Sequence, residues 1–324
     1  MESPGRLLSR SRLLLAGVAV LLVAVALYAL IVLIPGLGDD GDQAGTPASA
    51  STATATPAVS SAGLAGSIAV LAHQGGWEDG YPLETLPALV AAAESGATVE
   101  TDVHWTSDGV AILVHDERTT AASEAGPDHP MVCQGGPYTV SKTSWDVLRT
   151  RCRTLASASK DGRTYAIPTL NAALKKIAAI PDAQIVVEMK PEHPSDAQIR
   201  EYLATIAKYK LAGRTISSSF YPDALAKIKA LAAQDQLPLR FLLMMRPIAG
   251  QNLPTPDELS DQGLWGVALR TDIVTRSNIS SLHAKKLAVV VWTANTVEQW
   301  NAAKQAEADL VLTDKPNAYR AWLP

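Results

Sequence analysis

The chain carries little excess charge: its 324 residues have a formal net charge of −4 at pH 7. Proteins that bind nucleic acid need a basic face, so this balance argues against a nucleic-acid partner. It does not argue against a small anionic ligand, because a bound cation can reverse the sign of the local field. Cysteine is also scarce. The chain has two, and no histidine or further cysteine completes the ligand spacing of a zinc site around them.

Long apolar runs are absent, with one exception near the N-terminus. Residues 1–12 are basic, with three arginines, and residues 13–35 form an uncharged apolar run. Such a run, of roughly twenty residues, is long enough to cross a bilayer and exceeds the about 7–15 residues of a signal-peptide core. We therefore predict a retained transmembrane anchor at the cell membrane, with residues 1–12 in the cytoplasm and the rest extracytoplasmic. A cleaved signal and a secreted protein are the alternative.

Large apolar side chains are nearly absent from residues 36–66, which are rich in Ala, Thr, Ser, Gly and Pro. A segment of this composition cannot bury a core, so we predict a flexible linker with a span on the order of 30 Å. Internal repeats are not evident either. The remaining residues, 67–324, have the length of one β/α barrel, which is roughly 250 residues.

Short apolar runs alternate with helical segments over residues 67–324, the pattern of a parallel α/β sheet. Eight runs have the length of strands, the number in a TIM (β/α)8 barrel. They cover residues 68–72, 97–103, 184–189, 214–218, 239–244, 265–269, 288–292 and 309–312. A further run, Val110–Val114, is expected at the mouth of the barrel. The alternation lapses over about 117–166, where we predict an insertion after the second barrel unit.

Acid–base side chains gather at the ends of the first predicted strands. Positions i and i+2 of a strand point the same way, so Glu100 and Asp102 share a face. Two neighbouring carboxylates repel each other unless a cation lies between them, which favours a divalent ion held by oxygen ligands. His73 and His115 flank the pair, and histidine is the side chain best suited to proton transfer near neutral pH. In a barrel this end of the strands forms the active site.

The spacing of these residues resembles that of the glycerophosphodiester phosphodiesterase family. That family has a His-Arg-Gly turn, a Pro-Glu-Asn-Thr segment, a Glu-x-Asp pair, a Thr-x-Asp-Gly turn and a His-Asp pair. The matching residues here are His73, Pro82, Thr85, Glu100, Asp102, Thr106, Asp108, Gly109, His115 and Asp116. Two positions depart from the pattern: Gln74 replaces the arginine and Leu83 replaces the glutamate. Glu84 could stand in for that glutamate, although a neighbouring residue points differently. The departures bear on substrate class and rate more than on fold.

The resemblance continues to Pro316 and implies roles for later residues. Glu188 matches the third metal carboxylate, Lys190 a lysine that faces the phosphate, and Trp292 a tryptophan placed against the glycerol moiety. Without the resemblance, the Glu188–Lys190 pair is typical of a salt bridge at the barrel rim. Trp292 is likewise typical of an aromatic side chain that fills the top of the barrel.

The resemblance implies metal-dependent hydrolysis of a glycerophosphodiester to glycerol 3-phosphate and an alcohol. The implied cofactor is Ca²⁺ or Mg²⁺, bound by Glu100, Asp102 and Glu188. Lys190, Gln74 and Trp292 are the implied substrate-binding residues. We assign His73 as the base and His115 as the acid, with water or a substrate hydroxyl as the attacking group. The expected substrate is a small glycerophosphodiester or a glycerol-phosphate polymer of the cell envelope.

Two other functions remain open at this point. One is a non-catalytic extracytoplasmic barrel that binds glycerophosphoryl groups or envelope polymers. The presence of both proton-transfer histidines, His73 and His115, favours an enzyme over that binder. The other is a phospholipase D-like barrel acting on intact lipids, in which a shorter segment joins the first histidine to the acidic pair.

The predicted insertion contains both cysteines, Cys133 and Cys152. Outside the cytoplasm, an even pair in a loop-rich segment is expected to form a disulfide, and two free thiols are the alternative. Three histidines, His104, His129 and His283, lack comparable context, and we expect them at the surface or in loops.

Overall fold

The structure is a computed structural model that describes residues 69–121, 131–250 and 252–323. All of these belong to one compact unit, Ala55–Pro324. The predicted basic segment, transmembrane anchor and linker lie outside the described residues. Within the part that is described, no helix is both long and apolar enough to cross a bilayer.

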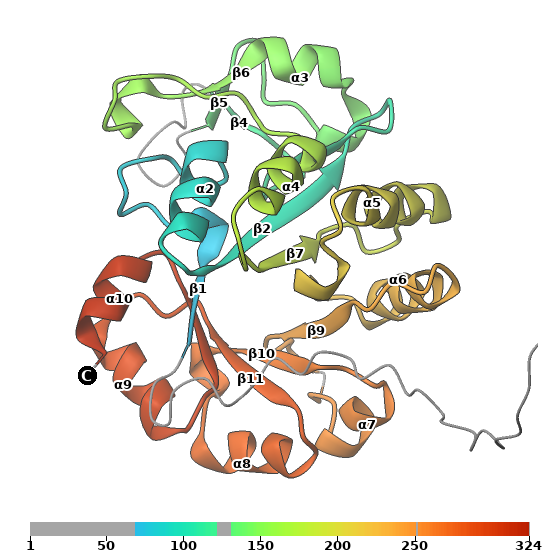
Figure 1. The fold of residues 1–324 in the computed structure, drawn as a ribbon, viewed down its shortest axis with the longest axis vertical. Helices are drawn as coiled ribbons and strands as arrows, with labels where there is room; N and C mark the ends of the chain where they lie inside the picture. The colour runs from blue at the N-terminus through green and yellow to red at the C-terminus, as the bar shows by residue number, and fades with distance from the viewer. Residues whose placement is uncertain (1–68, 122–130, 251, 324) are drawn as a thin grey trace, which may run out of the picture. The chain divides into compact units, whose positions relative to one another are not determined.

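Eight parallel strands close into a barrel, which confirms the predicted TIM-barrel class (Figure 1). Around the barrel they follow the order β1-β2-β7-β8-β9-β10-β11-β12, and β12 pairs with β1. Their bounds are Ala69–Ala72 (β1), Thr98–Trp105 (β2), Ile185–Met189 (β7), Thr215–Ser219 (β8), Arg240–Met245 (β9), Gly266–Arg270 (β10), Ala288–Trp292 (β11) and Leu310–Thr313 (β12). Each corresponds to a predicted strand and is shifted by at most two residues.

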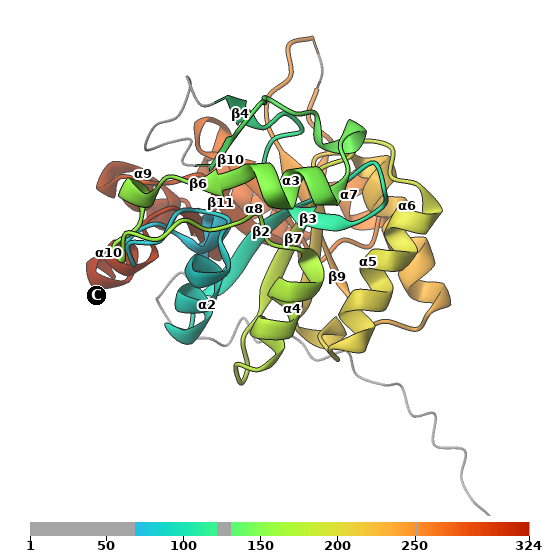
Figure 2. The ribbon, with the colours of Figure 1, turned by 90° about the horizontal axis from the view of Figure 1, so that it is seen from above.

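Helices surround the strands in both views (Figures 1 and 2). Several begin at a hydroxyl side chain that caps the first turn; Ser195 and Gln198, for example, form a reciprocal capping box. The α-helices are Leu86–Glu94 (α2), Trp145–Arg151 (α3), Leu170–Ala178 (α4), Asp196–Lys208 (α5), Pro222–Gln234 (α6), Pro256–Asp261 (α7), Arg276–Ala284 (α8), Val297–Gln305 (α9) and Pro316–Trp322 (α10). Short 3-10 turns occupy His73–Gly75 (η1), Val140–Lys142 (η3), Ala156–Ala158 (η4), Ala212–Arg214 (η5) and Thr271–Ile273 (η6).

The interior of the barrel is filled by one apolar side chain from most strands, among them Val186, Ile216 and Val290. Because side chains alternate along a strand, the residues two positions later face the same interior, one layer closer to the mouth. In β7 and β11 these are Glu188 and Trp292. The pattern that fills the barrel therefore also brings polar and aromatic side chains together at its C-terminal end.

The second β/α unit carries an insertion. Strand β3, Ala111–Leu113, pairs antiparallel with β2 and is not part of the barrel wall, as predicted. A small sheet follows, made of β4 (Thr120–Ala121), β5 (Met131–Cys133) and β6 (Cys152–Thr154). Helix α3 precedes β6, and α4, the helix of the second unit, comes afterwards. The insertion therefore interrupts this unit rather than following it.

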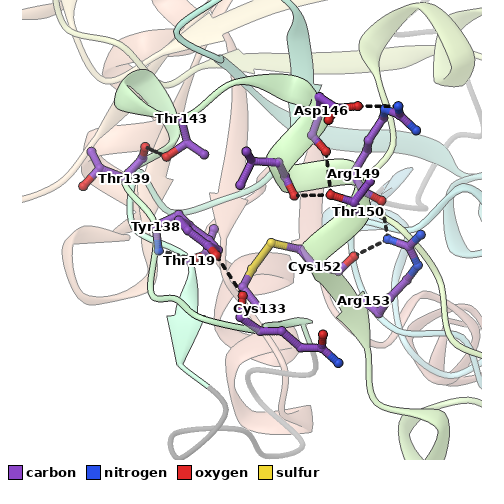
Figure 3. The surroundings of a disulfide bond; sticks show 12 residues. Thr119, Cys133, Tyr138, Thr139, Thr143, Asp146, Arg149, Thr150, Cys152 and Arg153 are labelled. Atoms are coloured by element: carbon purple, nitrogen blue, oxygen red, sulfur yellow. Dashed lines mark hydrogen bonds and ion pairs between the residues drawn. A yellow bond between two sulfur atoms is a disulfide. The ribbon is translucent and has the colours of Figure 1, made fainter.

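Cys133 and Cys152 form the predicted disulfide (Figure 3). They are paired residues of β5 and β6 and are almost completely buried. Beside them, Tyr138 and Thr119 exchange two hydrogen bonds, of 2.8 and 2.9 Å. The bridge thus ties the small sheet together next to the segment that leaves β3.

Candidate active site

Three buried carboxylates meet at the C-terminal ends of β2 and β7. Asp102 and Glu188 are partners in the parallel pairing of these strands, and Glu100 lies two residues before Asp102 on the same face. One oxygen from each carboxylate lies within 4.8 Å of the other two. The residues are 3% (Glu100), 1% (Asp102) and 6% (Glu188) exposed. The structure therefore brings the three predicted metal ligands together, and oxygen donors are the type that Ca²⁺ and Mg²⁺ prefer.

The negative charge of this acid cluster, Glu100, Asp102 and Glu188, is only partly balanced by protein. Burial and the neighbouring carboxylates raise the pKa of Glu100 well above its ordinary value. Burial, together with Asp102, raises the pKa of Glu188 to about 7. A divalent cation would remove this repulsion, so the electrostatics of the cluster fit such an ion.

Lys190 supplies one positive charge to the acid cluster. Its Nζ lies 2.9 Å from Glu188 Oε1 and 3.4 Å from Asp102 Oδ1. Although burial opposes the effect, Lys190 lowers the pKa of Asp102 below its ordinary value. Asp102 is thus the member of the cluster that ionises most readily.

Gln74, at the position of the family arginine, turns its polar groups toward the acid cluster. It lies in the turn after β1 with φ of 50°, a left-handed conformation. Its backbone N–H donates to Glu100 Oε2 at 3.0 Å, and its Nε2 donates to Asp102 Oδ2 at 3.0 Å. Gln74 therefore orients two of the three carboxylates, and its implied role in substrate binding stays a prediction.

Glu84 lies behind the cluster and is not part of it. Its carboxylate Oε1 accepts hydrogen bonds from Thr101 Oγ1 and from the backbone N–H of Asp102. Burial and the nearby Asp102 raise the pKa of Glu84 well above its ordinary value. Glu84 therefore supports the backbone of β2 from behind, a contact that the sequence did not reveal.

His73 is held by residues from the opposite end of the chain. Its Nδ1 lies 2.5 Å from Asp314 Oδ1, just after β12. Asn295 Nδ2 donates to Asp314 Oδ2 at 2.5 Å, while Asn295 Oδ1 accepts from the backbone N–H of Asp314 at 2.9 Å and from Thr313 Oγ1 at 3.0 Å. With Nδ1 engaged by a carboxylate, Nε2 is the ring atom left for proton transfer.

His115 follows β3 and lies at the edge of the site. The backbone N–H of Val114 donates to the carbonyl of Asp102 at 3.2 Å, which sets this segment beside the acid cluster. The Nδ1 of His115 lies 2.8 Å from Asp116 Oδ1, and its side chain is 50% exposed. The hydrogen bond to Asp116 raises the pKa of His115, so its protonated form persists to higher pH.

His104 was expected at the surface, and that expectation is wrong. It lies on β2 two residues after Asp102, on the same face of the strand as Glu100 and Asp102, and is 6% exposed. One ring nitrogen lies 3.3 Å from the carbonyl oxygen of His115 and the other 3.1 Å from Glu117 Oε2. His104 therefore supports the segment that carries His115. His283 is partly exposed and pairs with Asp309, and His129 lies outside the described residues.

Trp292 ends β11 and packs against the residues that fill the barrel. Its Nε1 donates to the carbonyl of Ala268 at 3.0 Å. Its ring meets that of Phe220, the residue after β8, edge to face with 5.2 Å between centroids. An aromatic pair thus spans part of the mouth.

A cavity of about 90 Å³ opens on the His115 side of the acid cluster. Gln74, Glu84 and His115 line it from the barrel, and Arg118 and Met131 line it from the insertion. The insertion therefore forms part of the wall of the site.

A family model, the glycerophosphoryl diester phosphodiesterase family, matches residues 73–318. The chain belongs to this family. The match begins at His73 and ends beyond Asp314, so both ends of the hydrogen-bonded chain around His73 lie inside it.

Two relatives match this chain over segments of very different length. Glycerophosphodiester phosphodiesterase 1 of Rattus norvegicus is 48% identical over 60 residues, which are 17% of this chain and 18% of that protein. "Probable glycerophosphodiester phosphodiesterase 2" of Mycobacterium tuberculosis is 25% identical over 270 residues, 77% of this chain and 88% of the relative. Most of the chain is thus similar to the bacterial protein, at low identity.

Two solved structures of phosphodiesterases share the fold. A glycerophosphodiester phosphodiesterase from Parabacteroides distasonis has a TM-score of 0.62 at 21% identity, covering 79% of this chain and 96% of the other. A phosphodiesterase from Oleispira antarctica, solved in complex with the product sn-glycerol-3-phosphate, has a TM-score of 0.60 at 21% identity. It covers 78% of this chain and 95% of the other.

Sequence reasoning about this family member missed the roles of Asp314, Asn295 and His104, and it named Glu84 only as a possible substitute for the family glutamate. Asp314 was seen only as part of the Thr-Asp-Lys-Pro segment that closes the barrel, and Asn295 only as a residue after Trp292. A polar residue within two positions of the end of a predicted barrel strand is the signal that could have marked Asp314. For His104 the signal was the alternation along β2, because it lies two residues after Asp102 and so shares the face of the acidic pair.

Proposed function

We propose that this protein is a metal-dependent phosphodiesterase that hydrolyses glycerophosphodiesters to glycerol 3-phosphate and an alcohol. The observation that carries the proposal is the cluster of Glu100, Asp102 and Glu188, together with the two histidines near it, His73 and His115. The product found in the structure of the Oleispira relative supports the substrate class.

The two histidines suit opposite proton transfers. With Nδ1 donating to Asp314, His73 keeps Nε2 as an acceptor, and it takes the proton of the attacking oxygen as that oxygen bonds to phosphorus. The bond from phosphorus to the leaving oxygen breaks, and protonated His115 donates a proton to that oxygen. Its raised pKa favours this acid role. The attacking oxygen comes from water or from a substrate hydroxyl.

Glu100, Asp102 and Glu188 would hold a divalent cation, Ca²⁺ or Mg²⁺. When bound, such an ion polarises a phosphoryl oxygen and offsets the charge that develops in the transition state. Lys190 adds a positive group beside the same oxygens, and Gln74 keeps two carboxylates oriented. Trp292 presents an aromatic surface for the glycerol carbons.

We also propose an extracytoplasmic location, anchored through residues 13–35. The apolar run is long enough to span a bilayer. The Cys133–Cys152 disulfide supports this location, because disulfides persist mainly outside the reducing cytoplasm. Substrates in that compartment include deacylated phospholipid headgroups and glycerol-phosphate polymers.

Incubation with glycerophosphocholine tests the proposed reaction. We expect choline and glycerol 3-phosphate to appear when Ca²⁺ or Mg²⁺ is present and to stop with a chelator. Glu188→Gln should lose most of this activity, and Glu94→Gln, an exposed carboxylate at the end of α2, serves as the matched control. Binding of the substrate without turnover in every metal would instead indicate a non-catalytic barrel.

Metal binding should also be visible in stability. The pKa of Glu188 is about 7 in the folded protein against an ordinary 4.5, so the folded state holds the extra proton between these values. The metal-free protein therefore loses stability as pH rises from 4.5 to 7, by about 3 kcal/mol for this group alone. Added Ca²⁺ should raise the melting temperature more at pH 8 than at pH 5. An equal rise at both pH values would count against binding at this cluster.

A further inference from the structure

The charge of the chain is divided unevenly between the insertion and the barrel. Residues 131–166 contain six lysines or arginines and two aspartates, a net charge of +4. All other residues together contain 22 basic and 30 acidic side chains, a net charge of −8. Soluble proteins usually mix both signs of charge over their surface, and a region of one sign attracts a partner of the opposite sign. The insertion is therefore the part of this chain that suits an anionic partner.

Helix α3 directs its polar side outward. Leu148 and Cys152 belong to the buried apolar cluster beneath the insertion. Because positions three and four residues apart share one side of a helix, Arg149 lies on the outer side, in line with Arg153 just beyond the helix end. Figure 3 shows both arginines on the side of Cys152 that is away from Cys133. The outer side of α3 is therefore lined by arginine.

We call the surface around α3 the basic face, and its cations are Lys142, Arg149, Arg151 and Arg153. Arg149 pairs with Asp146. Arg153 donates to the carbonyl oxygens of Arg149 and Cys152, groups that the end of a helix leaves without partners. Lys142 and Arg151 are exposed, and no acidic side chain of the described residues pairs with them. Two of the four cations therefore stabilise the helix, and two have no structural role that their contacts reveal.

The basic face lies on the same insertion that forms one wall of the active-site cavity. Arg118 and Met131 line that cavity. Strand β5, which begins at Met131, pairs with β6, the strand that directly follows α3. Helix α3 lies at the outer surface of the molecule in both views, and in Figure 2 it lies in front of the barrel. A partner held by the basic face would therefore lie beside the active-site cavity.

We propose that the basic face docks on the surface of an anionic phospholipid bilayer. A bilayer presents many phosphates in one plane, and each Lys or Arg close to that plane adds to binding without the need for a shaped pocket. The same plane repels the net charge of −8 on the rest of the chain, so attraction and repulsion together select one orientation. The proposed anchor at residues 13–35 favours a bilayer over a soluble polyanion, because it keeps a bilayer within reach of the face. The docking is independent of the proposed reaction.

Energy transfer to lipid tests the docking. The full chain would carry a donor dye on Thr150→Cys, an exposed position between Arg149 and Arg151, and the vesicles would carry an acceptor-labelled lipid. Transfer would be compared between vesicles of phosphatidylcholine and vesicles that also contain about 30% phosphatidylglycerol, in which we expect at least about twofold more transfer. The gain should disappear in about 1 M salt, where charges more than about 3 Å apart are screened. Equal transfer in the two kinds of vesicle would overturn the proposal.

Removal of the two unpaired cations tests whether this face causes the effect. In Lys142→Ala/Arg151→Ala, the equilibrium constant for docking on the anionic vesicles should fall about 30-fold, since each cation near the surface contributes about fivefold. Lys175→Ala/Lys176→Ala is the matched control: it removes two exposed lysines of α4, outside the insertion, and should leave docking unchanged. An equal fall in the control would show that net charge, and not this face, governs binding, and would overturn the proposal.

Two further measurements separate this proposal from others. A soluble glycerol-phosphate polymer that binds more tightly than the anionic vesicles, at equal phosphate concentration, would assign the face to a polymer and overturn the bilayer as its partner. Both double variants should cleave soluble glycerophosphocholine as the wild type does, because neither alters the acid cluster or its histidines. Cleavage without docking would thus overturn this proposal alone, and docking without cleavage would overturn only the proposed function.

Discussion

The two histidines of the site are held to different degrees. His73 is 21% exposed and lies 2.5 Å from Asp314, which Asn295 fixes in turn. His115 is 50% exposed and pairs with Asp116, its neighbour in the chain, which is 56% exposed. A firmly oriented acceptor suits an attacking oxygen that must approach phosphorus from one direction. A looser donor beside an open cavity suits leaving alcohols of different sizes.

The largest expected effect separates the base from the acid. His73→Ala should lower kcat/KM about 10³-fold for both glycerophosphocholine and a p-nitrophenyl glycerophosphodiester, because both need the attacking oxygen deprotonated. His115→Ala should lower it about as much for glycerophosphocholine, but less than about tenfold for the p-nitrophenyl substrate, whose leaving group needs no proton. The opposite pattern would exchange the two roles. Unchanged thermal unfolding would show that each variant keeps its fold.

Substitution of the carboxylate partner of each histidine should have a smaller effect than loss of the histidine itself. The partner of His73 should matter more than the partner of His115. Asp314→Asn should lower kcat/KM on the order of 10²-fold, because this partly buried partner, itself held by Asn295, fixes both the tautomer and the orientation of His73. Asp116→Asn should cost only a few-fold at its optimum. Asp116 raises the pKa of His115, so the substitution should lower that pKa. As pH rises, the variant should therefore lose activity at a lower pH than the wild type, because its acid gives up the proton earlier. A larger loss in Asp116→Asn than in Asp314→Asn would reverse the comparison.

The sequence predicted what depends on local periodicity. Alternation along β2 placed Glu100 and Asp102 on one face, and the count of apolar runs gave the barrel. Asp314 is 241 residues from His73, and the two meet only because β12 pairs with β1 when the barrel closes. No local pattern encodes that contact.

The role of Glu188 as a metal ligand was inferred from the family resemblance. His104 was expected at the surface or in a loop because no motif surrounds it in the sequence. Glu188 reaches Asp102 through the β2–β7 register, which spans the whole insertion. His104 is covered by the segment from His115 to Glu117, so its burial depends on how the insertion folds back. The contact of Glu188 with Asp102 therefore crosses the stretch in which the strand–helix alternation lapses, and those of His104 depend on how the chain turns back after β3.

The smallest expected effect tests whether the insertion supports His115 and not His73. The segment after His115 is tied to the insertion through Thr119–Tyr138 and through the backbone N–H of Val140, which donates to the carbonyl of Glu117 at 2.8 Å. The disulfide lies next to the first of these contacts (Figure 3). Loosening the insertion should therefore disturb the acid more than the base.

The variant is Cys133→Ser/Cys152→Ser. Its bridge closes a loop with a sequence separation of 19, so its loss should reduce the stability of the insertion by about 3 kcal/mol, measured by denaturant unfolding. Activity should fall less than about tenfold on glycerophosphocholine and hardly at all on the p-nitrophenyl substrate, which does not need His115. Reduced wild-type protein is the matched control and should behave like the variant. An equal loss on both substrates would show that the bridge supports the whole site, and the contrast between the two histidines would then not extend to the insertion.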